Sequence, residues 1–217
     1  MNIAFAPGCA LLIYKPELAD KIRHILARTH PGLSTHTTCC HHEPQQPEGT
    51  RIINVCAGCD RRYRELYPGI STLSLWELLA ESADFPFPDY EQQRMSIVDA
   101  CPTRDQERVH KAVRTLLKRM NIELIEPERT GTSGTCCGDS FYGVLPVDQV
   151  KEQMKKRAGE MPADDVVTYC VSCIKAMHIG GKRPRYLADL LFNEETSPGT
   201  FEPDRWHAEL DAFIAAH

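Results

Sequence analysis

The sequence lacks the features of several common protein classes. No apolar run approaches the roughly 18 residues that a membrane-spanning helix needs, so we expect no direct membrane insertion. The first residues carry no basic segment of the kind that opens an export signal. Lys and Arg (25) are fewer than Asp and Glu (30), and no basic stripe interleaved with aromatics occurs. We therefore expect no nucleic-acid partner.

Two familiar cofactor motifs are also missing. No G-x-G-x-x-G follows a predicted strand, so the sequence shows no sign of NAD or flavin binding. The C-x₂-C-x₂-C-x₃-C-P run of ferredoxins is absent as well. Any cofactor chemistry must therefore come from another arrangement of residues.

Cysteine, in contrast, is abundant, and its positions repeat. Ten cysteines form two sets, each made of a lone cysteine, an adjacent pair and a Cys-x-x-Cys in that order. The first cysteine group is Cys9, Cys39, Cys40, Cys56 and Cys59, and the second cysteine group is Cys101, Cys136, Cys137, Cys170 and Cys173. Disulfide frameworks belong to short secreted chains, whereas this chain has 217 residues and no export signal. We expect reduced thiols in a cytoplasmic protein.

The sequence around the cysteines repeats too. Apolar residues at helical spacing follow each lone cysteine, and a similar motif, LWELL or LADLL, follows each Cys-x-x-Cys. We interpret the chain as one duplicated unit, with a first domain at 1–85, a second at 93–195 and a C-terminal helix at 200–217. The proline-rich stretch 83–93 is the predicted linker.

Strands and helices are expected to alternate in each copy. Predicted strands cover residues 2–6, 52–55, 94–99, 122–125 and 166–169, and predicted helices cover 15–29, 104–120 and 203–216. This order is typical of an α/β fold, here two pseudo-symmetric copies of a small parallel-sheet unit. The cysteines then lie at the carboxyl ends of strands, where α/β sheets bind ligands. The last helix carries an apolar stripe that packs on its own domain or docks a partner: Trp206, Leu210, Phe213 and Ile214.

Five cysteines per copy exceed what the simplest metal sites use. Four thiolates suffice for a cubane iron–sulfur cluster or a structural zinc. The side chains of adjacent cysteines diverge, so both are ligands only if they serve different irons or an unusually shaped cluster. Structural zinc remains an alternative. Thiol redox chemistry at the two Cys-x-x-Cys motifs is another, but it leaves six cysteines unexplained.

The pattern C-x(n)-CC-G-x(n)-C-x-x-C, complete with Gly138 in the second copy, resembles the cysteine-rich CCG family. Its members include the B subunits of heterodisulfide reductases and iron–sulfur subunits of glycolate and lactate oxidation. The resemblance implies two non-cubane [4Fe–4S] clusters, each held by one cysteine group. The second group then forms the candidate catalytic site, with Gly138 beside the cofactor. His178, five residues after Cys173, is predicted either to lie beside the cofactor or to lie on a helix surface.

The first copy departs from this pattern. His41 replaces the glycine, and only 15 residues separate Cys40 from Cys56, too few for the helix expected there. All five cysteines are nevertheless present, so we still expect a cluster there, with greater exposure to solvent or a different number of irons. Further polar candidates are three histidines near the first pair and two cations near second-group cysteines: His36, His41, His42, Arg104 and Lys175.

We expect an oxidoreductase of the heterodisulfide reductase B type, which reduces a disulfide or passes electrons on. Its electrons would come from a flavoprotein or a ferredoxin-type iron–sulfur subunit, because the chain has no ferredoxin motif of its own. One alternative is a pure electron-transfer module for a flavoprotein or a quinone-linked dehydrogenase. A zinc-stabilised scaffold is the second alternative.

Overall fold

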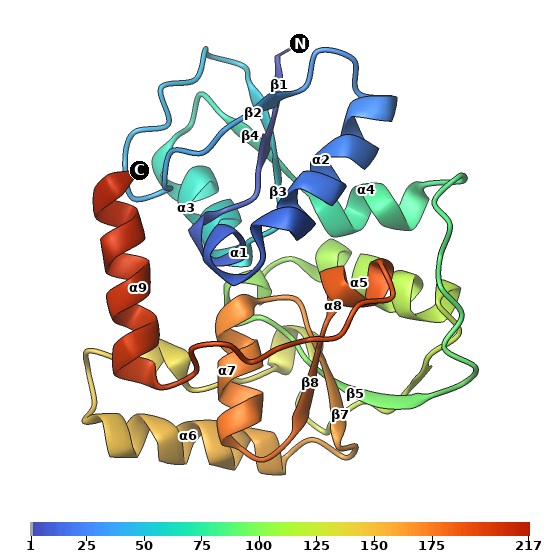
Figure 1. The fold of residues 1–217 in the computed structure, drawn as a ribbon, viewed down its shortest axis with the longest axis vertical. Helices are drawn as coiled ribbons and strands as arrows, with labels where there is room; N and C mark the ends of the chain where they lie inside the picture. Colours follow the sequence, from blue (N-terminus) through green and yellow to red (C-terminus); the bar gives the residue numbers. More distant parts are fainter. Residues whose placement is uncertain (1) are drawn as a thin grey trace.

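A computed structural model describes residues 2–217 and shows two parallel four-stranded sheets with the same strand order (Figure 1). The first sheet has the order β2-β1-β3-β4, with β1 Ile3–Ala6, β2 Ser34–Thr35, β3 Arg51–Asn54 and β4 Ser71–Ser74. The second has the order β6-β5-β7-β8, with β5 Arg94–Val98, β6 Glu123–Leu124, β7 Asp165–Thr168 and β8 Arg183–Tyr186. Corresponding strands occupy corresponding places, so the predicted pair of α/β units is confirmed.

The helices follow the same repeat with one difference. The first half contains α1 Cys9–Tyr14, α2 Pro16–Thr29, α3 Ala57–Leu66 and α4 Leu75–Glu81. The second half contains α5 Glu107–Arg119, α6 Val147–Gly159, α7 Val171–Ile179 and α8 Leu187–Leu191, and α9 Pro203–Ala216 follows it. Helix α6 lies between the cysteine pair and the third strand of its sheet, and residues 36–50 of the first half form no helix there.

Local sequence explains most of these elements. Helix α2 buries Leu18, Ile22 and Leu26 at helical spacing, and α5 buries Val109, Val113 and Leu116 in the same way. Two short elements were not predicted: Cys9 itself begins α1, and Cys101 begins a single 3₁₀ turn that ends at Thr103. The helix expected from residue 104 therefore starts only at Glu107.

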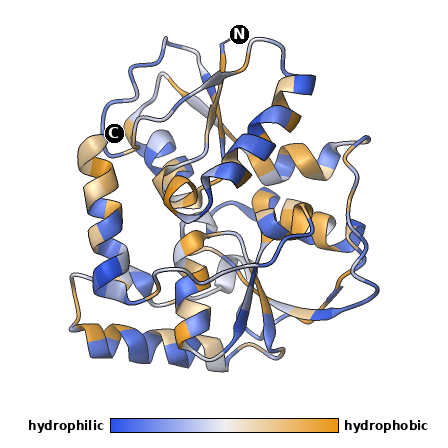
Figure 2. Ribbon diagram, in the orientation of Figure 1, coloured by the Kyte–Doolittle hydropathy of each residue, from blue (hydrophilic) through white to orange (hydrophobic). Residues whose placement is uncertain are grey.

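The two halves share one hydrophobic core. Helices α4 and α5 pack together, and their hydrophobic turns lie side by side in Figure 2. Buried Trp76 of α4 belongs to the same apolar cluster as Leu116 of α5 and Phe5 of β1. Burial of apolar side chains is the main source of folding free energy. Because this cluster includes residues of both halves, its burial also holds the two halves against each other.

A polar network adds to this contact. The buried carboxylate of Asp189 in α8 accepts hydrogen bonds from the Tyr14 hydroxyl at 2.5 Å and the Lys15 ammonium at 2.6 Å. The Thr196 hydroxyl donates to the same carboxylate at 2.9 Å. Residues at the end of α1 are thereby bonded to the last helix of the second half.

The connection between the halves is extended. Residues 82–93 contain no helix or strand, although Phe85 is buried in the shared core. The domain limits 1–85, 93–195 and 200–217 remain a prediction. Over residues 2–217, the structure has no helix with the length and apolar character that crossing a membrane requires.

Helix α9 packs on its own chain. Trp206 is buried in the shared core, and its indole N–H donates to Ser172 Oγ at 3.1 Å. Leu210 packs against the same core, while Ile214 packs against apolar residues of the first half. The sequence predicted that the apolar stripe either packs on its own domain or docks a partner, and the structure shows it packed within the chain.

Candidate functional site

The carboxyl ends of the strands position the cysteines. Cys56 follows β3 and is the N-terminal cap of α3, and Cys170 follows β7 and is the N-terminal cap of α7. The lone cysteines, Cys9 and Cys101, follow β1 and β5. Because parallel strands end at one edge of a sheet, each sheet gathers its cysteines at that edge.

The five thiols of the first cysteine group interact with one another. Each thiol alters the pKa of its neighbours, in the order Cys9, Cys39, Cys40, Cys59, Cys56. The neighbouring Cys59 thiol lowers the pKa of Cys56 to about 7 and also lowers the pKa of Cys40. Burial raises the pKa of Cys9, and repulsion from three other members of the group raises it further. Protons are thus shared unevenly within one cluster of thiols.

The second cysteine group repeats this pattern. Interactions between thiols that alter pKa values run in the order Cys101, Cys136, Cys137, Cys173, Cys170. The thiols of Cys101 and Cys137 lower the pKa of Cys136 far below its ordinary value, whereas the Cys136 thiol raises the pKa of Cys101. The backbone N–H of Gly138 also donates to Cys136 Sγ at 3.3 Å. In both groups the lone cysteine contacts the first cysteine of the pair, and the second contacts the Cys-x-x-Cys.

Both cysteine groups open on one cavity between the two halves. The cavity measures about 800 Å³, and nine of the ten cysteines line it, all except Cys39. Side chains of α9 complete the lining, namely Leu210 and Ile214. The sequence predicted one site in each copy but not that the two sites share this space.

The cavity wall is positively charged apart from the thiols. Arg61 and Arg62 of α3 and Arg104 of the second half line it. Arg62 donates to the Cys40 carbonyl at 3.1 Å, and Arg104 donates to the Gly134 carbonyl at 3.3 Å. The carboxylate of the lining, Asp139, is bonded to His207 at 3.1 Å. Arg62 and Arg104 therefore line the cavity with carbonyl groups as hydrogen-bond partners, and neither forms an ion pair with another of the described residues.

Gly138 directly follows the cysteine pair of the second group and lies against helix α6. It precedes a single 3₁₀ turn, Asp139–Phe141. Its φ is 112°, and a Cβ at this position would lie 2.8 Å from the backbone nitrogen and Cγ of Met154 in α6. The glycine is required by the close approach of α6, which in turn packs against Cys137.

Replacing Gly138 by alanine is expected to lower the free energy of unfolding by about 3 kcal/mol. The positive φ costs about 1–2 kcal/mol for a residue with a Cβ, and the clash with α6 adds about 1–3 kcal/mol. Gly143 is the matched control, because its φ is also positive at 77° but a Cβ there has no neighbour within 4 Å. Urea unfolding of both variants measures the difference. Equal losses in Gly138→Ala and Gly143→Ala would contradict this assignment.

A second glycine of the site was missed. Gly8 has a φ of +80°, and a Cβ there would lie 3.0 Å from Cys56 Cβ and 3.3 Å from Cys59 Sγ. It lets the end of β1 approach the Cys-x-x-Cys motif of the first cysteine group. The signal in the sequence was the glycine directly before Cys9.

The predicted polar residues are divided between the site and the core. Arg104 and His41 line the cavity, and His42 Nε2 lies 2.8 Å from the Ile214 carbonyl oxygen. Lys175 is buried beside Trp206 and Tyr14, with its ammonium donating to the Pro198 carbonyl, and does not line the cavity.

Two predicted histidines lie away from the cavity lining. His178 is in the last turn of α7, with its ring edge-on to Phe201 at 4.6 Å, and it does not line the cavity. His36 is buried against Tyr63, near the amide of Gln46.

The donor set fits an iron–sulfur cluster. Each group offers five interacting thiols, and thiolate sulfur is the usual protein ligand of iron–sulfur clusters. Among residues 2–217 no three His, Cys, Asp or Glu side chains are arranged around a point that suits a single metal ion. A cluster of several irons spreads its ligands over a larger volume than one ion does. Its binding would require the shared protons to leave.

Comparison with known proteins agrees with this chemistry. Residues 95–178 match the family described as "Cysteine-rich domain" (CCG). The chain is also 30% identical over 101 residues to a protein of Chromohalobacter salexigens named "Probable membrane-anchored ferredoxin". This alignment covers 44% of the present chain but only 15% of that much longer relative.

Proposed function

We propose that this chain is an iron–sulfur oxidoreductase subunit of the heterodisulfide reductase B type, because residues 95–178 match the cysteine-rich domain (CCG) family. Each cysteine group holds one non-cubane [4Fe–4S] cluster in this proposal. The observation that carries it is the shared cavity, which nine of the ten cysteines line. The cysteines of each group also pack together in the same way, which supports equivalent ligand roles for most of their members. Cys101 is placed with its group by its effect on the pKa of Cys136.

The clusters would occupy the parts of the cavity beside the thiols, and a substrate would bind in the space between them. When bound, the clusters would supply electrons one at a time, and a partner flavoprotein or ferredoxin-type subunit would replenish them. Reduction of a disulfide takes two electrons and two protons and yields two thiols. The whole cavity, about 800 Å³, is in the upper part of the roughly 300–1,000 Å³ range of ligand sites and has to hold both the clusters and the substrate. The apolar side chains of Leu11, Leu210 and Ile214 exclude water from part of it.

A pure electron-transfer module is the second candidate. The name of the Chromohalobacter salexigens relative favours it, since a ferredoxin passes electrons without breaking bonds in a substrate. In that case the cavity would admit no substrate, and reduced protein would react with a flavoprotein or a quinone-linked dehydrogenase.

Anaerobic purification followed by iron and sulfide analysis tests the proposal. We expect about eight irons and eight inorganic sulfides per chain, four for each of two clusters. Titration of the reduced protein with a disulfide then separates the two functions. Spectral change and released thiol support the reductase, and oxidation only by an electron acceptor supports the transfer module. Protein that contains no iron contradicts both.

Arg104 is expected to favour anionic disulfides. Replacing Arg104 by glutamine should lower kcat/KM about tenfold for dithiodipropionate, which carries two carboxylates, because a hydrogen bond to a charged group contributes about 1.5–3 kcal/mol. The uncharged bis(2-hydroxyethyl) disulfide should react at an unchanged rate. Arg108→Gln is the control, since Arg108 is exposed on α5 and pairs with Glu77. Equal losses for the two disulfides would contradict a role in substrate charge.

A further inference from the structure

Helix α9 contacts the first cysteine group and the residues around the second, although it follows both copies of the repeat. Figure 1 shows it running along one side of the molecule, and it packs against α1 of the first half and α6 of the second. Its first turns contact the second group's surroundings: Trp206 donates to Ser172, inside the Cys-x-x-Cys motif, and His207 is bonded to Asp139. The rings of His207 and Tyr142 are stacked with their centroids 3.8 Å apart, which adds to the contact between the start of α9 and the second half.

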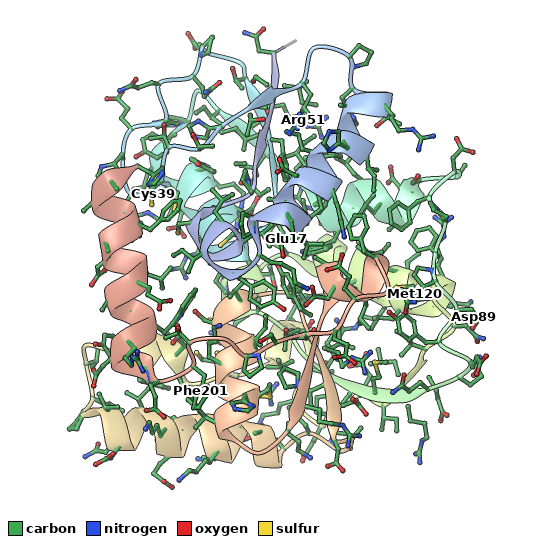
Figure 3. The ribbon with its side chains drawn as sticks, viewed as in Figure 1. Glu17, Cys39, Arg51, Asp89, Met120 and Phe201 are labelled. Carbon is green, nitrogen blue, oxygen red and sulfur yellow. The ribbon has the colours of Figure 1, made fainter. Side chains whose placement is uncertain are left out.

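The other end of α9 lies at the first cysteine group. The backbone N–H of Cys39 donates to the His217 carbonyl at 3.2 Å, and Figure 3 shows Cys39 beside that end of the helix. Ile214 packs against an apolar cluster that includes Cys39, Cys40 and Cys59. It also lines the cavity.

In the second half the corresponding cover comes from α6. Val150 and Met154 of α6 pack in one apolar cluster with Cys137 and Cys173. The first half has no such helix, because the loop between Cys40 and Cys56 is too short. Even so, Cys40 and Cys59 are as deeply buried as Cys137 and Cys173. Something outside the first repeat must therefore provide part of the cover.

We propose that α9 replaces the missing helix of the first copy, with Ile214 covering the first cysteine group as Met154 covers the second. In this assignment the shortened first copy is a complete site only together with a helix that follows the second copy. The proposal depends on the proposed function in one respect: it assumes that the cysteines of the first group are cluster ligands. The shielding itself is a property of the thiols and is measurable without iron.

The apolar cover controls access to the thiols. A carboxylate at position 214 would draw water into the contact between α9 and the first group, because an unpaired charge is not stable against apolar side chains. Cys39, Cys40 and Cys59 would then become accessible to small reagents. The second group, covered by α6, would keep its own protection.

Alkylation with iodoacetamide of Ile214→Glu tests this inference, with mass spectrometry to locate the modified cysteines. We expect Cys40 and Cys59 to react about tenfold faster than in the unchanged chain, a change of about 1.4 kcal/mol in protection. Cys137 and Cys173 should react at the unchanged rate. Ala215→Glu is the matched control, since Ala215 is exposed on the same helix and is expected to leave all rates unchanged.

The outcomes separate the possible failures. Unchanged rates at Cys40 and Cys59 in Ile214→Glu would overturn the inference, and so would equal acceleration in both cysteine groups, which indicates general loosening. The milder variant Ile214→Ala, which adds no charge, should show a smaller acceleration confined to the first group. When iron is present, the first group should release it faster to a chelator in Ile214→Glu. Iron-free protein would contradict the proposed function and still permit the alkylation measurement.

Discussion

Replacing Cys137 by serine is expected to remove about half of the iron and sulfide, because one of the two proposed [4Fe–4S] clusters loses a ligand. Cys137 is buried and packs in one cluster with Cys136 and Cys173 of the second group. Serine has nearly the same shape but is a poor ligand for iron. Replacing a residue that only supports a metal ligand typically lowers metal affinity or activity about 10–100-fold. Replacing the ligand itself should cost more, so we expect the rate of disulfide reduction to fall at least about 100-fold.

Two further variants make this measurement specific. Cys40→Ser, the equivalent change in the first group, should also remove about half of the iron, since we propose one [4Fe–4S] cluster for each group. Thr135→Ser is the control, because Thr135 lines the same cavity without contributing a thiol. Full iron content in Cys137→Ser would show that this cysteine is not a ligand. Full content in Cys40→Ser alone would restrict the cluster to the second half.

Replacing Asp99 by alanine is expected to lower the free energy of unfolding by about 3 kcal/mol, the lower end of the range for breaking a buried ion pair. Asp99 is buried, and Arg114 donates to both of its oxygens, at 2.6 and 2.8 Å. Burial alone would raise its pKa, but the bonds from Arg114 hold the pKa at about 2. The Tyr169 hydroxyl and the Gly131 N–H also donate to the carboxylate, at 2.9 and 2.7 Å.

Thermal unfolding provides the measurement. For a chain of this size, about 2–4 °C is lost per kcal/mol, so the melting temperature should fall by roughly 10 °C. Glu107→Ala is the matched control, because the Glu107–Lys111 pair is exposed on both sides and such pairs contribute at most about 0.5 kcal/mol. Equal effects of the two substitutions would contradict the importance of the buried network.

This network also holds the second cysteine group. Asp99 lies two residues before Cys101, Tyr169 directly precedes Cys170, and Gly131 belongs to the loop that leads to Cys136. One carboxylate thus connects the three segments that supply second-group thiols. We expect Asp99→Ala to release second-group iron more readily than first-group iron, in addition to its effect on stability.

The sequence by itself determined the repeat, the α/β class and the two cysteine groups. These follow from local patterns: apolar residues at helical spacing, short apolar runs before cysteines, and the order of the cysteines along the chain. Strand ends in a parallel sheet share one edge, so the gathering of distant cysteines was predictable as well. The short helix α1 was not, because its N-cap, Gly8, has no side chain to accept a capping hydrogen bond.

Tertiary structure decided how the two groups relate to each other and what covers them. The packing of α4 on α5 turns both groups toward one cavity, and that packing is a contact between residues far apart in the chain. The place of Ile214 over the first group and the approach of Met154 to Gly138 are likewise long-range contacts. Sequence periodicity reports which face of an element is apolar but not which partner covers it, so only the folded chain supplies these answers.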